Sequence, residues 1–176
     1  MTVLVDAAAW EWRGAKWAHL VSDESYDELH DFARRIGKRR LGFQGDHYDI
    51  EAVDRERAID LGAEVVDARV LVRRLRAAGL RRRDHKPTWQ RVAHAAIGEQ
   101  LSGAGLPGRL GDVIGAVADV DRRSRSSVYV DDAHVVALFD FSADLIVPAE
   151  MNVDLVWHGE PRADGERSLE LFLARG

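Results

Sequence analysis

The feature that most constrains the fold is a helix whose two ends are both marked in the sequence. Ser25 with Glu28 matches the capping box, in which side-chain oxygens pair with the backbone N–H groups that a helix start leaves unpaired. Gly37 is placed to end the helix. Between these signals the apolar residues recur at helical spacing: Tyr26, Leu29, Phe32, Ala33 and Ile36. The sequence therefore predicts an amphipathic helix that must bury one face against another element.

Short apolar runs lie on both sides of this helix, and four of them have the length of strands: Val3–Val5, Ala18–Val21, Leu41–Phe43 and Ala63–Val66. The tryptophan-rich stretch between the first two is expected to be a loop. A second helix is predicted from about Ile50 to Leu61, and a third begins after its cap, Asp67. Strands that alternate with helices favour a small α/β domain over residues 1–80.

The charged segment 81–87 ends in Pro87 and is the best candidate for a linker. Beyond it we expect two amphipathic helices, from Trp89 to Leu101 and from Leu110 to Val117. The period then changes to short, partly alternating runs that predict antiparallel strands: Val128–Val130, Val135–Phe141, Leu145–Val147, Val153–Trp157 and Leu169–Leu173. The predicted class is α/β (α+β), with residues 88–176 as a helix pair plus antiparallel strands.

Composition excludes several classes of site. Cysteine is absent from the 176 residues, so disulfides, thiolate zinc sites and cysteine nucleophiles are excluded. No apolar stretch approaches the roughly 20 residues of a membrane-spanning helix, and no cationic leader precedes Asp6. We expect a cytoplasmic protein with no membrane partner.

The net charge of −5 conceals an uneven distribution, because basic residues gather within residues 34–40 and 69–91 while the C-terminal third is acidic. A basic face attracts polyanions, so nucleic acid is one expected partner. The arginines that would contact it are Arg73, Arg74, Arg76, Arg81, Arg82 and Arg83. The alternatives are a solvated surface or a surface covered by the acidic half of the chain. Self-association as a homodimer is a further expectation.

Residues 17–50 hold three of the seven histidines, His19, His30 and His47, together with several carboxylates. Ordinary packing rarely needs so many titratable groups so close together. A metal-dependent hydrolase needs hard or borderline ligands that converge on one cation and leave a position for water. The candidates fall into two sets, with His19, Asp23, His47 and Asp49 as catalytic residues and Asp6 and His30 as metal ligands.

The metal would be Mg²⁺, Mn²⁺ or Zn²⁺, although no diagnostic spacing such as HExxH is present. We expect His47 and Asp49 to converge only from a turn, not from a regular strand. Two alternatives stay open: His30 flanks the apolar stripe of its helix and could simply hydrogen-bond there, and His19 or His47 could act as a general base without a metal. The sequence lacks a GxSxG elbow, a P-loop and a dinucleotide fingerprint.

In the second half, Asp131 and Asp132 follow a predicted strand and could bind Mg²⁺ together with Asp112 or Asp119. A turn in which aspartates bond their own backbone explains the pair equally well. Trp10, Trp12 and Trp17 are close enough in sequence to line a pocket, although core packing is the simpler interpretation.

The strings VLVDAAAW, WAHLVSD, DELHDFARRIG, FQGDHYDI and RAIDLGA give the first 80 or so residues a resemblance to a bacterial and phage family known as domain of unknown function 4031. The resemblance implies a compact α/β domain and supplies no catalytic assignments. VYVDDAHVV and GERSLELFL are similar to the end of RusA-type Holliday junction resolvases, which are dimeric, metal-dependent nucleases. The stretch GRLGDVIGAVAD lacks the lysine and one aspartate of that family's pattern.

These observations lead to two hypotheses. The first is a metal-assisted phosphodiester hydrolase, or nuclease-like enzyme, that uses the His/Asp cluster. The second is a non-enzymatic module of phage or bacterial origin that binds nucleic acid or protein.

Overall fold

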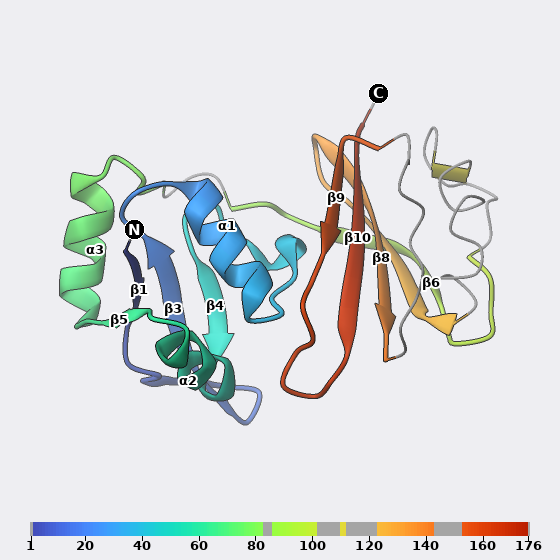
Figure 1. Ribbon diagram of the computed structural model, residues 1–176. Coiled ribbons are helices and arrows are strands. Elements are labelled where there is room, and N and C mark those ends of the chain that lie inside the picture. The colour runs from blue at the N-terminus through green and yellow to red at the C-terminus, as the bar shows by residue number, and fades with distance from the viewer. Residues whose placement is uncertain (1, 83–85, 102–109, 112–122, 143–152, 176) are drawn as a thin grey trace. The chain divides into compact units, whose positions relative to one another are not determined.

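The structure is a computed structural model that describes residues 2–82, 86–101, 110–111, 123–142 and 153–175 (Figure 1). The chain divides into two compact units, Met1–Pro87 and Thr88–Gly176. No helix among the described residues is long and apolar enough to cross a membrane. The predicted linker at 81–87 stays a prediction, although Arg81 and Arg82 both bind Asp46 of the first unit.

The first unit is built on a five-stranded sheet centred on β3 (Ala15–Ser22). β3 pairs antiparallel with β1 (Val3–Val5), β2 (Trp10–Trp12) and β4 (Tyr48–Glu51). β5 (Glu64–Val65) lies parallel to β1. The strands predicted at the first, second and fourth apolar runs are therefore confirmed.

Two predictions of element type in this unit are wrong. The tryptophan-rich stretch is a hairpin, because Arg13 and Gly14 both adopt positive φ (51° and 79°), the conformation of a two-residue turn between β2 and β3. Leu41–Phe43 is not a strand, since Arg40–Gly42 forms a 3₁₀ turn and only Phe43 makes a bridge, to Tyr48.

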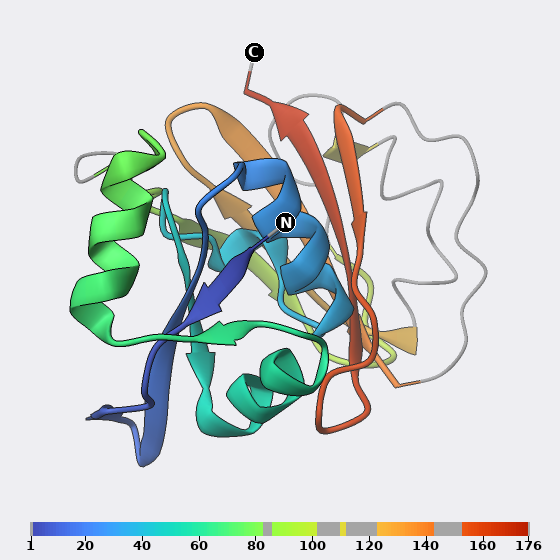
Figure 2. The same ribbon diagram turned by 60° about the vertical axis from the view of Figure 1, so that its left-hand side comes forward.

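Helices cover both faces of the sheet (Figure 2). α1 (Tyr26–Arg35) and α2 (Ala52–Asp60) pack on the face that carries Val5, Leu20 and Ile50, and α3 (Ala68–Ala77) packs on Leu4 and Val21. Each fully buried Leu or Ile side chain contributes about 1.5–3 kcal/mol to the free energy of folding.

The predicted helix ends are largely confirmed. The Glu28 N–H donates to Ser25 Oγ at 3.1 Å, and the Arg69 N–H donates to Asp67 at 2.8 Å. α2 begins two residues later than predicted, because Ile50 is a fully buried member of β4.

The second unit is an antiparallel sheet in the order β6 (Gln90–Ala95), β7 (Arg125–Val130), β8 (His134–Phe141), β10 (Arg167–Ala174) and β9 (Leu155–His158). Four of the predicted strands are confirmed. The helix predicted from Trp89 to Leu101 is wrong, because pairing of Gln90–Ala95 with β7 overrides the helical spacing of its apolar residues. The helix predicted at Leu110–Val117 and the strand at Leu145–Val147 fall mostly or wholly outside the described residues.

Candidate metal centre

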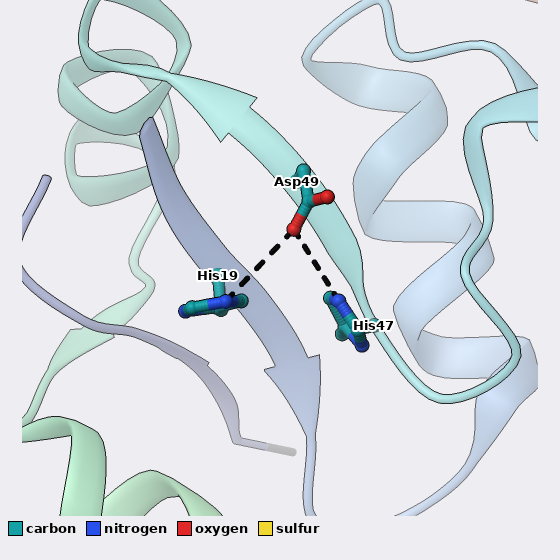
Figure 3. Close-up of side chains that lie close together, drawn as sticks. All are labelled: His19, His47 and Asp49. Atoms are coloured by element: carbon teal, nitrogen blue, oxygen red, sulfur yellow. Dashed lines mark ion pairs between the residues drawn. The ribbon is translucent and has the colours of Figure 1, made fainter. Parts of the chain in front are cut away.

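Three side chains meet on one face of the first sheet: His19, His47 and Asp49 (Figure 3). His19 on β3 lies directly opposite Asp49 on β4, and directly opposed residues of an antiparallel pair share a face. His47 immediately precedes β4 and points to the same side. One ligand atom from each residue lies within 4.8 Å of the other two.

The Asp49 carboxylate lies between the two imidazoles. Asp49 Oδ1 is 3.3 Å from His47 Nε2 and 4.0 Å from His19 Nε2. His47 ends the turn over residues 44–47 that leads into β4, as expected, although residues two apart along an extended chain also project to the same face. α3 packs on this face at Leu4 and Val21, and the side chains of His19, His47 and Asp49 stay 38%, 21% and 28% exposed.

Asp6 binds the nitrogen of His19 that is farther from Asp49. Its Oδ2 lies 2.8 Å from His19 Nδ1, and its Oδ1 accepts the His19 backbone N–H at 2.7 Å. Asp6 directly follows β1, where the irregular residues before β2 let its side chain take the place of a backbone acceptor. Arg55 Nε donates to the Asp6 carbonyl oxygen at 2.7 Å and fixes the backbone there. Asp6 thus orients a candidate ligand and lies outside the group of three.

Asp46 holds His47 in the same way, with Oδ1 2.6 Å from His47 Nδ1. Asp46 is only 1% exposed, and its other oxygen accepts from Arg81 Nη1 at 2.9 Å and from the Arg82 backbone N–H at 2.8 Å. Asp46 was not among the candidate residues predicted from the sequence. The one signal for its role is an acid directly before a histidine at the start of a buried strand, which is a weak pattern.

These partners fix where the imidazole protons lie. Ionised carboxylates only accept hydrogen bonds, so both Nδ1 atoms must carry a proton. In a neutral imidazole the Nε2 atom then carries no proton but a lone pair. The Nε2 lone pairs of both histidines face Asp49 Oδ1. That oxygen is itself buried and accepts no hydrogen bond from the described residues. Three acceptors that face one another require a cation among them, either a proton on an imidazole or a metal ion.

The pKa values of the cluster respond to the same geometry. The hydrogen bond to Asp6 is the main cause that raises the pKa of His19 above its usual 6.5, against a smaller opposing effect of burial. For Asp49, burial raises the pKa, but the contact with His47 and the charges of both histidines outweigh it and leave the pKa below 3.8. The protein therefore favours a cation beside a charged carboxylate at this position.

The donor set suits a borderline divalent cation. Ligands about 2.0–2.1 Å from a tetrahedral Zn²⁺ lie about 3.3 Å apart, which is the spacing of His47 Nε2 and Asp49 Oδ1. Closing the 4.0 Å gap to His19 Nε2 requires a movement of less than 1 Å. Imidazole nitrogen suits Zn²⁺, Mn²⁺ or Fe²⁺ better than Mg²⁺, which prefers oxygen ligands. Carboxylates that hold the far nitrogen of each histidine are the usual second layer of such sites.

Two of the predicted residues lie apart from this group. Asp23 accepts from Arg74 Nε at 2.7 Å, and Arg74 also binds Glu64, so Asp23 ties β3 to α3. His30 is 6% exposed within α1, and its Nδ1 lies 2.8 Å from the Tyr48 hydroxyl. His30 packs on the face of the sheet that α1 and α2 cover, where its ring centre lies 4.6 Å from that of Phe43.

In the second unit, Asp131 forms the turn that was the alternative interpretation. Its Oδ1 accepts the backbone N–H groups of Ala133 at 2.8 Å and His134 at 2.6 Å. Asp132 is exposed in the same turn. Asp112 and Asp119 lie outside the described residues, so a metal site that uses them stays a prediction, as does the likeness to RusA-type resolvases.

The three candidate ligands and the two carboxylates that hold their imidazoles all lie in the part of the chain that the family comparison covers. Residues 3–78 match the family model described as Protein of unknown function (DUF4031). This confirms the resemblance of the first unit, and the DUF4031 segment contains Asp6, His19, Asp46, His47 and Asp49. Comparison with curated proteins and with solved structures gave no match. The family description assigns no activity.

Proposed function

We propose that the protein is a metal-assisted hydrolase of phosphodiesters. The observation that carries the proposal is the convergence of two Nε2 lone pairs on Asp49 Oδ1, with both Nδ1 atoms held by buried carboxylates. His19, His47 and Asp49 would hold a divalent cation, and Asp6 and Asp46 would keep the two imidazoles oriented. Three protein ligands leave further positions for water and substrate, as in catalytic rather than structural metal sites.

The metal would supply two effects, a lowered pKa for its bound water and neutralisation of charge on a phosphoryl oxygen. In the overall reaction the water oxygen bonds to phosphorus and gives up a proton, one P–O ester bond breaks, and the leaving alkoxide takes up a proton to become the alcohol. The histidines are held in one tautomer and one orientation throughout. Their role is to present fixed ligands at no cost in reorganisation.

The charges of the cluster favour an anionic substrate only when a cation is present. With neutral imidazoles, the carboxylates of Asp6, Asp46 and Asp49 outnumber Arg81 and Lys86, the cations among the described residues whose charges act on His19 and Asp49. A phosphate would be repelled by this net negative group. A bound dication reverses the sign and attracts it.

A basic surface on α3 supports a polyanionic substrate. Arg69, Arg73 and Arg76 are exposed at helical spacing on one side of α3, where they could contact phosphates. Arg74 and Arg81 are occupied by ion pairs with Asp23 and Asp46. Arg83 lies outside the described residues.

The first experiment is a metal titration of the full chain followed by thermal unfolding. Zn²⁺ or Mn²⁺ should raise the melting temperature, with a gain in stability of about 2.7 kcal/mol at a hundredfold excess over Kd, and Mg²⁺ should have a smaller effect. Hydrolysis of bis(p-nitrophenyl) phosphate should depend on the same metal. Asp49→Asn should abolish both effects, whereas Asp164→Asn, which changes a 59% exposed carboxylate in the second unit, should change neither.

Two outcomes would overturn parts of the proposal. If no divalent ion raises the melting temperature of the wild-type protein, the metal site is excluded. If the metal stabilises the protein but no phosphodiester is hydrolysed faster than by Asp49→Asn, the site is a metal site without this activity.

A further inference from the structure

Three tryptophans form a continuous aromatic surface that begins at the candidate metal ligands. The centre of the Trp10 ring lies 5.9 Å from that of the His19 imidazole. Trp10 also stacks on Trp17, with 5.8 Å between the ring centres. Trp12 meets Trp17 edge-on at 5.7 Å. We call Trp10, Trp12 and Trp17 the tryptophan platform.

The strand register places the tryptophan platform on the same face as the cluster. Trp10 is directly opposite Trp17, and Trp17 lies two residues before His19 along β3. Trp12 lies two residues after Trp10 along β2. Alternation along each strand and direct pairing across strands therefore aim all three rings to the side of His19 and Asp49.

The tryptophan platform is more exposed than packing requires. Trp12 is 50% exposed, although tryptophan is normally highly buried on average. Trp10 and Trp17 are half-buried, and the Trp17 indole N–H donates to the Trp12 carbonyl oxygen at 3.1 Å, which fixes the hairpin that presents the rings. The rings are thus held in place and left partly uncovered.

Cations lie over two of the rings. The Arg13 guanidinium lies over the Trp12 ring, 4.4 Å from its centre, and Lys38 Nζ, which also pairs with Asp54, lies over the Trp17 ring, 5.9 Å from its centre. Aromatic rings next to cations are the combination with which proteins bind unpaired nucleotides, since every base has a face that stacks and every phosphate a charge. A double helix offers no free base face to such a surface.

We infer that the tryptophan platform binds an unpaired base of single-stranded nucleic acid, so that the neighbouring phosphodiester lies at the His19, His47 and Asp49 cluster. The part of this inference that concerns hydrolysis of the neighbouring phosphodiester rests on the proposed function. The base contact itself depends only on the tryptophan platform and Arg13.

The test measures binding by the full chain of a fluorescent thymidine oligonucleotide with phosphorothioate linkages, and of an abasic strand of the same length. The base-bearing strand should bind about 5- to 150-fold more tightly, the range that base stacking on one aromatic ring contributes. Trp12→Leu, which keeps apolar area but removes the ring, should lose most of this preference. Trp12→Phe should retain part of it.

Two controls separate this inference from the proposed function. Ile97→Ala removes a 66% exposed apolar side chain from the second unit and should leave the preference unchanged. The metal-induced rise in melting temperature should be the same in Trp12→Leu as in wild type, because the ring of Trp12 contacts Trp17 and Arg13, which are not candidate ligands.

Equal binding of the base-bearing and abasic strands would overturn the inference, even if the metal response is intact. Tighter binding of thymidine monophosphate than of the strand would overturn the assignment to a polymer. A base preference that persists in EDTA and is lost in Trp12→Leu would support the tryptophan platform even if the metal test fails.

Discussion

At the scale of single residues, the site depends on which nitrogen of each histidine carries the proton. Asp6 and Asp46 fix the Nδ1 protons of His19 and His47, and the remaining lone pairs face Asp49. The two buried carboxylates therefore determine the chemistry without being ligands. The same arrangement makes a cation, whether proton or metal, the natural partner of the site.

The raised pKa of His19 predicts opposite pH dependences for the metal-free and metal-bound proteins. In EDTA, the stabilisation from protonated His19 is fully present below the unfolded pKa of about 6.5 and is lost as pH rises through the higher folded pKa. Metal binding requires a deprotonated imidazole, so metal affinity should rise over that same pH range.

Urea unfolding at several pH values, with EDTA and with Zn²⁺, measures both effects. His19→Gln should flatten the pH dependence in EDTA, whereas His158→Gln, which replaces an exposed histidine of the second unit, should leave it unchanged. A stability in EDTA that increases from pH 6 to pH 8 would contradict the predicted direction.

The candidate site residues differ in how far their roles could be predicted from the sequence. His19, His47 and Asp49 were candidates because few other roles explain titratable groups so close together. Asp23 and His30 were equally good candidates by spacing, but Asp23 pairs with Arg74 and His30 with Tyr48. Those partners lie 51 and 18 residues away, so local sequence gave no sign of them.

At the scale of elements, the site is held by the turn that leads into β4. Gly45 adopts a φ of 93°, and the Gln44 N–H donates to the His47 carbonyl oxygen at 2.8 Å. Asp46 then points inward and binds the backbone after α3 through Arg82 N–H. The turn, β4 and the end of α3 are thus joined at one buried carboxylate.

Asp46→Asn tests this junction. Loss of the buried charge that pairs with Arg81 should lower the free energy of unfolding by about 1.5–3 kcal/mol. Metal affinity should fall about 10- to 100-fold, because His47 loses the partner that fixes its tautomer. Chemical unfolding and metal titration measure the two effects separately.

Asp54→Asn is the matched control, since Asp54 is 8% exposed and pairs with Lys38 away from the cluster. It should lower stability without a loss of metal affinity. If Asp46→Asn lowers stability but binds metal as tightly as wild type, Asp46 is a structural residue only.

The elements also show where local sequence suffices. α1 and α3 were predicted together with their caps, because a serine or aspartate that bonds its own backbone is a local interaction. β6 was mistaken for a helix because its register depends on β7, about 35 residues away. The Trp10–Trp12 hairpin was missed because Arg13, a residue that rarely adopts positive φ, occupies its turn.

At the scale of the whole molecule, the cluster, the tryptophan platform and the basic side of α3 all belong to the first unit, and the DUF4031 segment spans them. The second unit is an antiparallel sheet whose apolar core is its own, with Phe139, Leu169 and Leu171 buried completely or nearly so. The proposed chemistry is therefore a property of the first unit.

X-ray absorption spectroscopy of the zinc-loaded full chain tests the central claim most directly. We expect one zinc per chain with two imidazole nitrogens and carboxylate or water oxygens at about 2.0–2.2 Å, and one imidazole fewer in His47→Gln. A zinc environment made only of oxygen ligands, or one unchanged in His47→Gln, would contradict the assignment of His19, His47 and Asp49 as a metal centre.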